Sequence, residues 1–296
     1  MIIKKFMLNF IVNPTAGGKH GKKIKKCVQK LKSELDRKAI EHSFHFSDKK
    51  GGATILTKQL IEAGATDVIV VGGDGTLHEV INGFSNFESV NMGIVPCGTG
   101  NDFAFALNIP KDPIKALNLI INGTAKHTDF MQMPTVRGLN VIGMGIDVEV
   151  LKRYEKLKKK NKFGYTKCLI KTLCKFDYTE FQAEIGEKST HYRSFIAAVA
   201  NGCVFGGGIP ICPVASPVDG ALDFLAVKSI KKLGIIGAFL KLKKGKVLSL
   251  RQTCHEKITE INIKTSSPCT VNVDGELYEN IPFNVKIISN TLKIYR

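Results

Sequence analysis

The sequence predicts an N-terminal α/β domain with a parallel sheet, followed by a C-terminal all-β sandwich domain with helical insertions. The first 130 residues alternate apolar, strand-like runs with helix-like segments, which is typical of a parallel sheet covered by helices. After Asp129 the strand-like segments become short and closely spaced, which favours an antiparallel sandwich. A chain of 296 residues also exceeds the roughly 250 residues at which single cores stop growing. We therefore expect domains at residues 1–130 and 131–296, although the last strand could return to the first domain.

The elements of the first domain follow from its apolar runs. Strands are predicted at 6–12, 42–46, 67–71 and 91–95, because each is a short run of apolar or β-forming residues. Helices are predicted over the Lys-rich stretch that ends at Lys38, over 53–63, and between the last two strands. Ligands of such open sheets bind at the carboxyl ends of the strands, so the loops that follow these strands carry the predicted site.

Seven strand segments are predicted in the second domain, at 178–185, 194–200, 221–227, 258–263, 269–273, 284–288 and 291–295. Helical insertions are expected at 147–175 and 229–244. The first insertion carries seven Lys or Arg among residues 152–162, which indicates either a solvated face or a contact with anionic phospholipid headgroups. In the second, Leu233, Ile236 and Leu240 have helical spacing, which favours core packing and leaves an interfacial amphipathic helix as the alternative.

Composition narrows the class of protein. A hydrophobic content of 44% and a charged content of 23% are those of an ordinary globular chain. A net charge of +17 attracts anions, including acidic lipid surfaces. No apolar run reaches the roughly 18 to 20 residues needed to span a bilayer, so we expect a cytoplasmic protein, peripheral on the inner face of the membrane. The cysteines form no C-x-x-C pair and the histidines show no ligand spacing, so we assign neither to a metal.

Three glycine-rich turns follow three predicted strands, at 13–18, 72–76 and 96–102. None matches the usual nucleotide-binding signatures G-x-x-x-x-G-K-[ST] or G-x-G-x-x-G. Each turn nevertheless leads toward a helix N-terminus, so backbone N–H groups should converge on a polyphosphate. Asp74 would repel phosphate unless a cation lay between them, which implies Mg²⁺, and Asp102 offers a second carboxylate. Thr76 and Glu79 also fit a helix capping box, so part of this motif could be structural.

These turns resemble a known motif set. The segments NPTAGG, GGDGTLHEVING and PCGTGNDFA are similar, in order and spacing, to those of the diacylglycerol kinase catalytic-domain family, in its bacterial YegS-like lipid kinase branch. The resemblance implies the fold shared by NAD kinases and diacylglycerol kinases, with ATP and Mg²⁺ as cofactors. Ser47 stands where the family usually has threonine. The nucleotide contacts implied by the resemblance are Asn13, Pro14, Thr15, Ala16, Gly17, Ser47, Gly73, Asp74, Gly75, Thr76, Leu77, His78, Glu79, Thr99, Asn101 and Asp102.

Two Asp-Gly turns of the second domain acquire roles through the same resemblance. Each is also a strong hairpin signal, so a purely structural role is the alternative. The resemblance makes Asp274 the first choice for catalytic base and Glu276 the second, and alternate residues of an extended strand would face the same side. It also implies Mg²⁺ binding by Asp219 with the carbonyls of Ser216 and Ala221. Asp223 would support that metal site without binding the ion itself.

The function implied by the resemblance is transfer of the γ-phosphate of ATP to a lipid hydroxyl, with diacylglycerol the first-choice acceptor and phosphatidic acid the product. The nucleotide would be bound by residues 1–130 and the lipid by residues 131–296. The expected partner is a lipid substrate at an anionic membrane surface; nucleic acid is not expected, and a homodimer is left open. The alternatives are an NAD kinase-type phosphotransferase and a catalytically silent ATP- or membrane-binding module. The lipid kinase interpretation predicts that Asp74→Asn and Asp274→Asn each abolish transfer without loss of fold.

Overall fold

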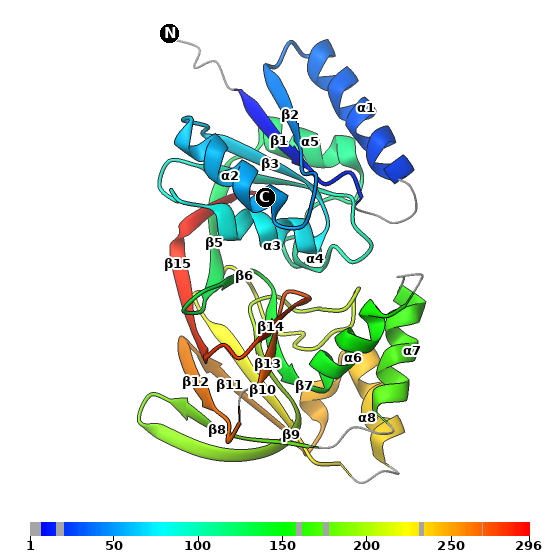
Figure 1. Cartoon of the computed structure of the whole chain (residues 1–296), viewed down its shortest axis with the longest axis vertical. Coiled ribbons are helices and arrows are strands. Elements are labelled where there is room, and N and C mark those ends of the chain that lie inside the picture. Colours follow the sequence, from blue (N-terminus) through cyan, green and yellow to red (C-terminus); the bar gives the residue numbers. More distant parts are fainter. Residues whose placement is uncertain (1–6, 16–20, 158–161, 174–177, 231–233, 268) are drawn as a thin grey trace. The chain divides into compact units, whose positions relative to one another are not determined.

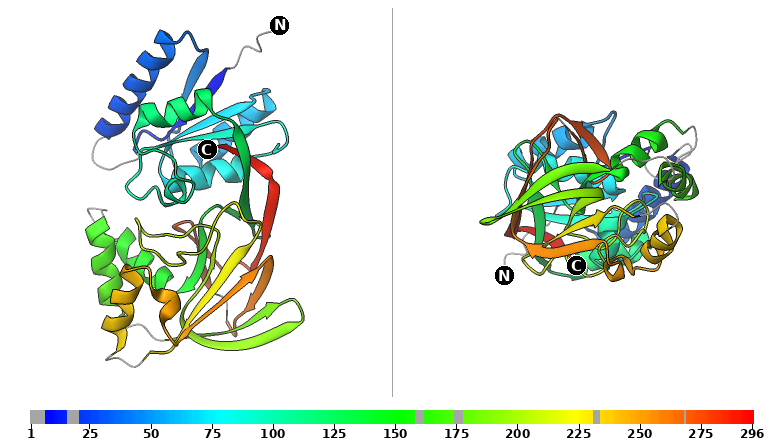
Figure 2. Two further views of the ribbon diagram at one scale, coloured as in Figure 1. Left: turned by 180° about the vertical axis from the view of Figure 1, so that it is seen from behind. Right: turned by 90° about the horizontal axis from the view of Figure 1, so that it is seen from below.

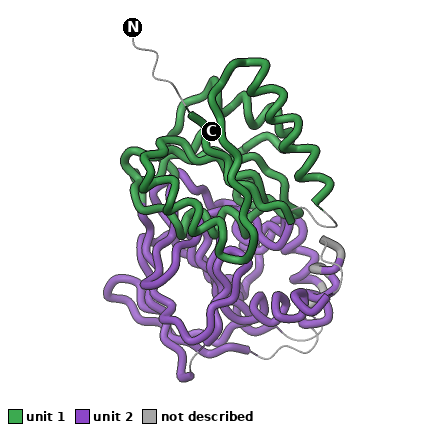
Figure 3. Tube along the Cα trace, turned by 45° about the horizontal axis from the view of Figure 1, so that its top comes forward, with its two compact units in different colours: residues 1–128, 289–296 green, residues 129–288 purple. Residues whose placement is uncertain are grey.

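The chain folds into two compact units (Figure 3). The structure is a computed structural model that describes residues 7–15, 21–157, 162–173, 178–230, 234–267 and 269–296. Unit 1 comprises Met1–Thr128 and Ser289–Arg296, and unit 2 comprises Asp129–Ile288. The units are connected by two strands, β5 (Ala125–Gln132) and β15 (Phe283–Tyr295). The division falls two residues before the expected boundary, and the last residues of the chain belong to unit 1.

Unit 1 is built on a parallel sheet, as predicted. The strand order is β2, β1, β3, β4, with the end of β15 beside β4. Every residue of β1 and β3 is buried, which explains their unbroken apolar sequences, whereas β2 lies at the edge and is half-buried. The strands are β1 (Leu8–Val12), β2 (His42–Phe46), β3 (Asp67–Gly72) and β4 (Asn91–Pro96).

Helices cover the two faces of this sheet. Figure 1 shows α2 (Gly52–Glu62) and α3 (Asp74–Gly83) packed together on the near face. Figure 2 (left) shows α1 (Lys22–Arg37) and α5 (Pro113–Asn122) together on the opposite face. A short helix, α4 (Asp102–Ala106), follows β4. The lysines of α1 lie opposite a buried stripe, so this Lys-rich segment is amphipathic; the stripe is Ile24, Cys27, Val28, Leu31 and Leu35.

The end of β15 is fixed in unit 1 by a buried carboxylate. Asp67 is fully buried and accepts hydrogen bonds from the Tyr295 hydroxyl at 2.5 Å, the Thr66 hydroxyl at 2.7 Å and the Asn91 amide at 3.1 Å. Burial, and next the hydrogen bond to Asp67, raise the pKa of Tyr295 above its usual range, so the phenol remains a donor. This network ties residues that are 228 positions apart in the sequence.

We expect Tyr295→Phe to lower the free energy of unfolding of unit 1 by about 2 kcal/mol, because a hydrogen bond to a buried charge is lost. Denaturant titration of the purified chain measures this change. Tyr178→Phe is the matched control: its hydroxyl donates to the neutral carbonyl of Ile230 at 3.1 Å, so its loss should cost about 1 kcal/mol. Equal effects of the two substitutions would contradict the importance of the Asp67 charge.

Unit 2 is an antiparallel β-sandwich with helices, as predicted. Its strands pair in the order β14, β13, β7, β9, β8, β12, β15, and β10 lies between β9 and β11. The strands are β6 (Arg137–Gly138), β7 (Val141–Gly145), β8 (Thr179–Ile185), β9 (Lys188–Ala200), β10 (Leu222–Lys228), β11 (Thr253–Ile258), β12 (Glu260–Lys264), β13 (Thr270–Val273) and β14 (Glu276–Glu279). The helices are α6 (Ile146–Glu155), α7 (Lys162–Leu173), α8 (Ile235–Lys243) and the 3-10 turn η3 (Val247–Ser249).

Both faces of β9 and β10 are buried. Val199 and Phe224 belong to the core inside the sandwich, whereas Ala198 and Leu225 belong to a second core beneath the helices. Figure 1 shows α6, α7 and α8 gathered beside these strands. Two buried faces explain why residues 194–200 and 221–227 are almost continuously apolar instead of alternating.

Several predicted elements of unit 2 differ in the structure. Residues 284–288 and 291–295 belong to one strand, β15, and the first insertion contains two helices, α6 and α7. On α8, the side chain of Leu240 is 52% exposed, whereas Phe239 and Leu242 pack into the core beneath the helices. The prediction that this side packs into the core is therefore wrong at Leu240. Leu233 and the side chain of Ile236 lie outside the described residues. None of the described helices has both the length and the apolar character needed to cross a bilayer.

Candidate active site

The three glycine-rich segments of unit 1 follow the carboxyl ends of β1, β3 and β4. After β1, the Asn13 side chain accepts hydrogen bonds from the amide and hydroxyl of Thr15, at 3.0 and 2.8 Å, which forms a tight local turn. Pro14 lies within this turn, and Ala16 and Gly17 lie outside the described residues. After β2, Ser47 is buried, and its amide donates to the carbonyl of Val12 at 2.9 Å. Its position is thus fixed by the neighbouring strand.

Glycine is required where the second and third segments meet. A Cβ atom on Gly73 would lie 2.8 Å from the Cα of Gly98, and one on Gly98 would lie 2.4 Å from the Cα of Gly73. Real Cβ atoms do not approach other atoms so closely, so only two glycines permit this contact of backbones. The sequence GGDGT and the sequence CGTGN are therefore spatially adjacent because both lack side chains at this point.

Asp74 fastens the same two segments. Its Oδ2 accepts a hydrogen bond from the amide of Asn101 at 2.8 Å, and its Oδ1 accepts one from the amide of Phe103 at 3.2 Å. Asn101 has φ 59° and its side chain also bonds both backbone groups of Gly98. These two hydrogen bonds from amides at the start of α4 give Asp74 a structural role that the sequence did not predict, and its contact with Mg²⁺ stays a prediction.

The capping box predicted for α3 is wrong. The helix begins at Asp74 after Gly73, with no side-chain cap, and Thr76 is buried inside its first turn. Glu79 instead caps α2: its two carboxylate oxygens accept from the amides of Gly51 and Ala53, at 2.9 and 3.0 Å. Glu79 therefore joins α3 to α2. It supplies a negative charge at the start of α2, which has no acidic residue in its own first turn.

The remaining predicted nucleotide contacts divide by exposure. The buried residues among them are Ser47, Thr76, Leu77, His78 and Asp102. Thr15, Gly75 and Thr99 are exposed. The contacts themselves stay predictions, and exposed backbone and hydroxyl groups on glycine loops are the groups that a polyphosphate would use.

In unit 2, Asp274 and Gly275 form the two-residue turn between β13 and β14. Their φ angles of 54° and 96° are both left-handed, as a type I′ hairpin turn requires. The chain reverses between Asp274 and Glu276, so the idea that the two acids share one face of an extended strand is wrong. The hairpin turn is thus confirmed, and a catalytic role for Asp274 or Glu276 stays a prediction.

Three backbone amides hold the Asp274 carboxylate. Its Oδ1 accepts from Asn140 at 2.8 Å and Val141 at 3.1 Å, and its Oδ2 accepts from Leu139 at 2.6 Å. Such charge-assisted hydrogen bonds fix the direction of a carboxylate rigidly. Asp274 therefore joins the β13–β14 hairpin to the start of β7.

Asp219 lies in an exposed loop before β10. Its Oδ2 is 2.5 Å from the Nζ of Lys257, and its Oδ1 accepts from the amide of Ala221 at 3.2 Å. Asp129 holds this loop by two hydrogen bonds. Its carboxylate accepts from the amide of Gly220 at 2.9 Å, and its own amide donates to the carbonyl of Pro217 at 2.8 Å. A carboxylate and nearby carbonyls are hard oxygen donors suited to Mg²⁺, and the Lys257 ammonium already takes the place of a cation beside Asp219. The predicted set, including Ser216, therefore fits a magnesium ion chemically.

Asp223 does not support this loop as predicted. It lies on β10, fully buried, and its Oδ1 is 2.6 Å from the Nε2 of His255 on β11. Asp223 pairs in register with Lys257 of β11, and His255 lies two residues before Lys257 on the same face of the sheet. The Asp223 side chain therefore contacts His255 as a diagonal neighbour.

Unit 2 also contains an apolar cavity between the sheet and its helices. Its accessible volume is about 70 Å³. The walls include Leu169 on α7, Phe195 on β9 and Phe239 on α8, and Asp147 is the one ionisable side chain among the lining residues that the structure describes. Its lining suits an apolar ligand, but the cavity is smaller than the roughly 300 Å³ at which ligand sites usually begin, so its walls must move apart to admit an acyl chain.

Asp147 is 3% exposed at the start of α6. Burial raises the pKa of its carboxyl to about 6, while the Asn272 side chain at 3.1 Å and the amide of Val148 act in the opposite direction. The sequence analysis missed this residue. A strand that ends in glycine and is followed by an acid, GMGID, repeats the pattern of VGGDG and could have revealed it.

The two units have the fold that diacylglycerol kinases and NAD kinases share. Comparison with known proteins gives the family. The diacylglycerol kinase catalytic domain model matches residues 7–133, and the YegS C-terminal NAD kinase beta sandwich-like domain model matches residues 140–296. The chain belongs to the bacterial lipid kinase family that combines these two domains, as its motifs predict.

Individual relatives agree over almost the whole chain. A diacylglycerol kinase from Staphylococcus carnosus is 28% identical, with 96% of this chain and 93% of the relative covered. A solved diacylglycerol kinase from Bacillus anthracis is 22% identical with a TM-score of 0.72, covering 98% of this chain and 96% of that one. An NAD kinase from Archaeoglobus fulgidus in complex with ATP is 11% identical with a TM-score of 0.56, covering 98% and 94%. At these identities the two structures confirm the fold alone.

Proposed function

We propose that the chain is an ATP- and Mg²⁺-dependent kinase that phosphorylates a lipid hydroxyl, with diacylglycerol as acceptor and phosphatidic acid as product. The apolar cavity of unit 2 is the observation that carries this proposal. A soluble acceptor such as NAD gains little from such walls, whereas an acyl chain buried there is stabilised by about 0.8 kcal/mol for each methylene group. A relative named diacylglycerol kinase supports the choice of acceptor.

Unit 1 would bind ATP through its glycine segments. The Asp74 carboxylate fixes the start of α4 against the Gly73 loop, so amides of both loops are held in place before a ligand arrives. Preorganised N–H donors stabilise phosphate charge without further reorganisation. Exposed Thr15 and Thr99 would add hydroxyl donors to the phosphates.

Unit 2 would supply the acids that act on the acceptor. The three backbone amides hold the Asp274 carboxylate in one orientation, and a carboxylate of fixed orientation suits a proton acceptor. Glu276, which opens β14, would be the second acid. Asp219, with the carbonyls of Ser216 and Ala221, would hold Mg²⁺ after Lys257 moves aside. Bound magnesium neutralises negative charge, which here would stabilise the loop before β10.

Helices α7 and α8 would face an anionic membrane surface. Ile170 and Leu240 are 47% and 52% exposed on these helices. Exposed lysines flank both side chains: Lys167 and Lys171 on α7, and Lys241, Lys243 and Lys244 beside Leu240. Apolar side chains among cations suit interfacial binding, with about 1 kcal/mol from each lysine near an anionic surface. Co-sedimentation with anionic vesicles, weakened by salt, would measure this contact.

The proposed function is tested by two substitutions, one that fills the cavity and one that adds the same ring to an exposed helix position elsewhere. Labelled ATP is offered with diacylglycerol vesicles or with NAD. We expect phosphorylated lipid and no phosphorylated NAD. Ala238→Phe fills the cavity and should reduce lipid phosphorylation at least about 10-fold, because roughly 1.4 kcal/mol of acyl burial is lost.

Ile55→Phe is the matched control, since it adds an aromatic ring to an exposed helix position of unit 1 that belongs neither to the cavity nor to the proposed membrane surface. It should leave lipid phosphorylation within about twofold. ATP binding, measured by calorimetry, should be equal in both variants. Phosphorylation of NAD, or equal lipid turnover by the two variants, would contradict the proposal.

A further inference from the structure

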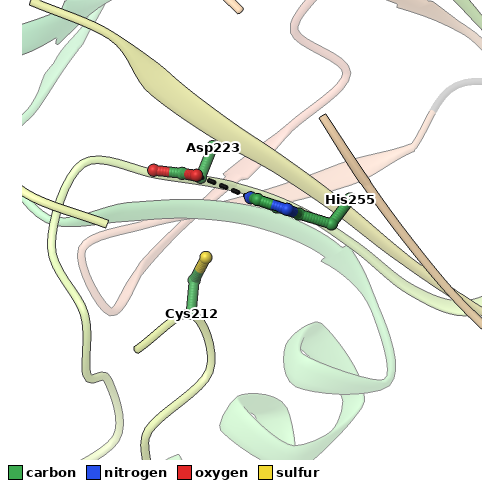
Figure 4. Close-up of side chains that lie close together, drawn as sticks. All are labelled: Cys212, Asp223 and His255. Atoms are coloured by element: carbon green, nitrogen blue, oxygen red, sulfur yellow. Dashed lines mark hydrogen bonds and ion pairs between the residues drawn. The ribbon is translucent and has the colours of Figure 1, made fainter. Parts of the chain in front are cut away.

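Three side chains of unit 2 gather outside the sites described above. Cys212, Asp223 and His255 each offer one ligand atom, and these atoms all lie within 4.8 Å of one another. Figure 4 shows the Cys212 thiol directed toward the hydrogen-bonded pair of Asp223 and His255. Cys212 and Asp223 are fully buried, and the His255 side chain is 29% exposed.

The fold fixes this arrangement from three separate segments. Asp223 and His255 are diagonal neighbours on the paired strands β10 and β11. Cys212 lies in the segment before β10. Its amide donates to the backbone carbonyl of Cys203 at 3.3 Å, and its carbonyl accepts from the amide of Ala215 at 3.0 Å. Backbone bonds therefore hold the thiol in place independently of the other two side chains.

The buried carboxylate is only partly satisfied. The Oδ1 of Asp223 is 2.6 Å from His255, but its Oδ2 is buried and has no hydrogen-bond partner within the described part of the chain. A buried polar atom without a partner costs about 1–3 kcal/mol. An additional cation in the cluster would satisfy this atom, which is a second reason to regard the three residues as ligands.

We propose that Cys212, Asp223 and His255 bind one Zn²⁺ ion. Zinc bonds of about 2.0–2.3 Å place two tetrahedral ligands about 3.5 Å apart, so shifts of about 1 Å would complete the site. A thiolate, a carboxylate and a neutral imidazole balance the two positive charges, which favours burial of the ion. The exposed edge of His255 leaves the fourth position open to water.

The ligand chemistry separates this ion from magnesium. Sulfur and nitrogen ligands select zinc and similar transition metals, whereas Mg²⁺ requires oxygen ligands. The ion would cross-link Cys212 to the β10–β11 pair and thereby secure the segment that carries Asp219. This role adds a structural metal to the molecule and does not depend on which lipid is phosphorylated.

The same three residue types could instead form a cysteine nucleophile with its base. The surroundings of the thiol oppose this alternative. Cys212 is fully buried, so a substrate cannot reach its sulfur atom. Reactive cysteines are exposed and have lowered pKa values.

The test is zinc binding by the full chain after treatment with a chelator. Competition with a chromophoric zinc indicator should give one Zn²⁺ per chain, and Co²⁺ should produce a thiolate-to-cobalt absorption band. His255→Gln and Cys212→Ala should each weaken zinc binding by about 100-fold or more and remove the cobalt band or shift it.

Two control variants separate this cluster from other donors. His191→Gln removes an exposed histidine of the same unit. Cys27→Ala breaks up the buried pair of Cys27 and Cys97 in unit 1, whose sulfur atoms are 3.1 Å apart. Both controls should retain zinc and the cobalt band. Absence of stoichiometric zinc in the parent chain, or its retention by His255→Gln and Cys212→Ala, would overturn the proposal.

Discussion

Asp274→Asn is expected to abolish lipid phosphorylation and to lower the free energy of unfolding of unit 2 by about 3 kcal/mol. Three backbone amides donate to this carboxylate. Asparagine keeps a single acceptor oxygen and turns an NH₂ group toward at least one of the donors, so buried donors are left unsatisfied. The turn itself should survive, because asparagine tolerates the φ of 54° found at this position.

Denaturant titration and a phosphorylation assay, performed at a temperature where the variant remains folded, measure the two effects separately. Glu276→Gln is the matched control on the neighbouring acid and should cost less stability, because Glu276 opens a strand at a half-buried position. Full stability of Asp274→Asn would show that the three hydrogen bonds contribute little. Normal activity in the folded variant would remove Asp274 from the chemistry.

The structure thus changes one expectation from the sequence, namely that Asp274→Asn would leave the fold intact. Asp74 calls for the same revision, since its carboxylate holds Asn101 and Phe103 by their amides. The sequence showed where acids follow strands, but their partners are backbone N–H groups 27 to 135 residues away. Every residue except proline carries such a donor, so no sequence pattern marks the ones that are used.

Burial explains which elements the sequence could predict. The strands of unit 1 are buried on both faces and are unbroken apolar runs, so their type and order were readable. Strand β11, with the sequence TCHEKI, was missed because most of its residues are half-buried or exposed. It forms by pairing with β10, and this pairing also brings His255 to Asp223. The residues of a cluster that forms across two paired strands have no characteristic spacing in the sequence, so no motif marks them.

The apolar cavity shows the same limit. Asp147 was placed only at the start of a helical insertion, whereas its buried carboxylate accepts a hydrogen bond from Asn272 of β13, 125 positions away. The sequence could suggest amphipathic helices, but not which of their faces would enclose a carboxyl group.

Asp147→Asn is expected to stabilise unit 2 at pH 7 while weakening lipid phosphorylation. Burial raises the carboxyl pKa from 3.8 to about 6, so the folded state binds the proton more tightly than the unfolded state. The resulting penalty is absent below about pH 4, grows as the pH rises, and is complete above about pH 6. A shift of about 2 units corresponds to about 3 kcal/mol, which the uncharged amide would recover at neutral pH.

The difference in unfolding free energy between variant and parent, measured from pH 4 to pH 8, should rise from near zero to about 3 kcal/mol. Glu187→Gln, an exposed acid of the same unit, should show no such rise. Activity should fall about 10-fold or more with diacylglycerol, if the carboxyl bonds the polar end of the lipid. A stabilised variant with full activity would leave the pKa argument intact and remove Asp147 from substrate binding. If the stability gained by Asp147→Asn does not rise with pH, neighbouring groups already stabilise the charged carboxylate in the folded state.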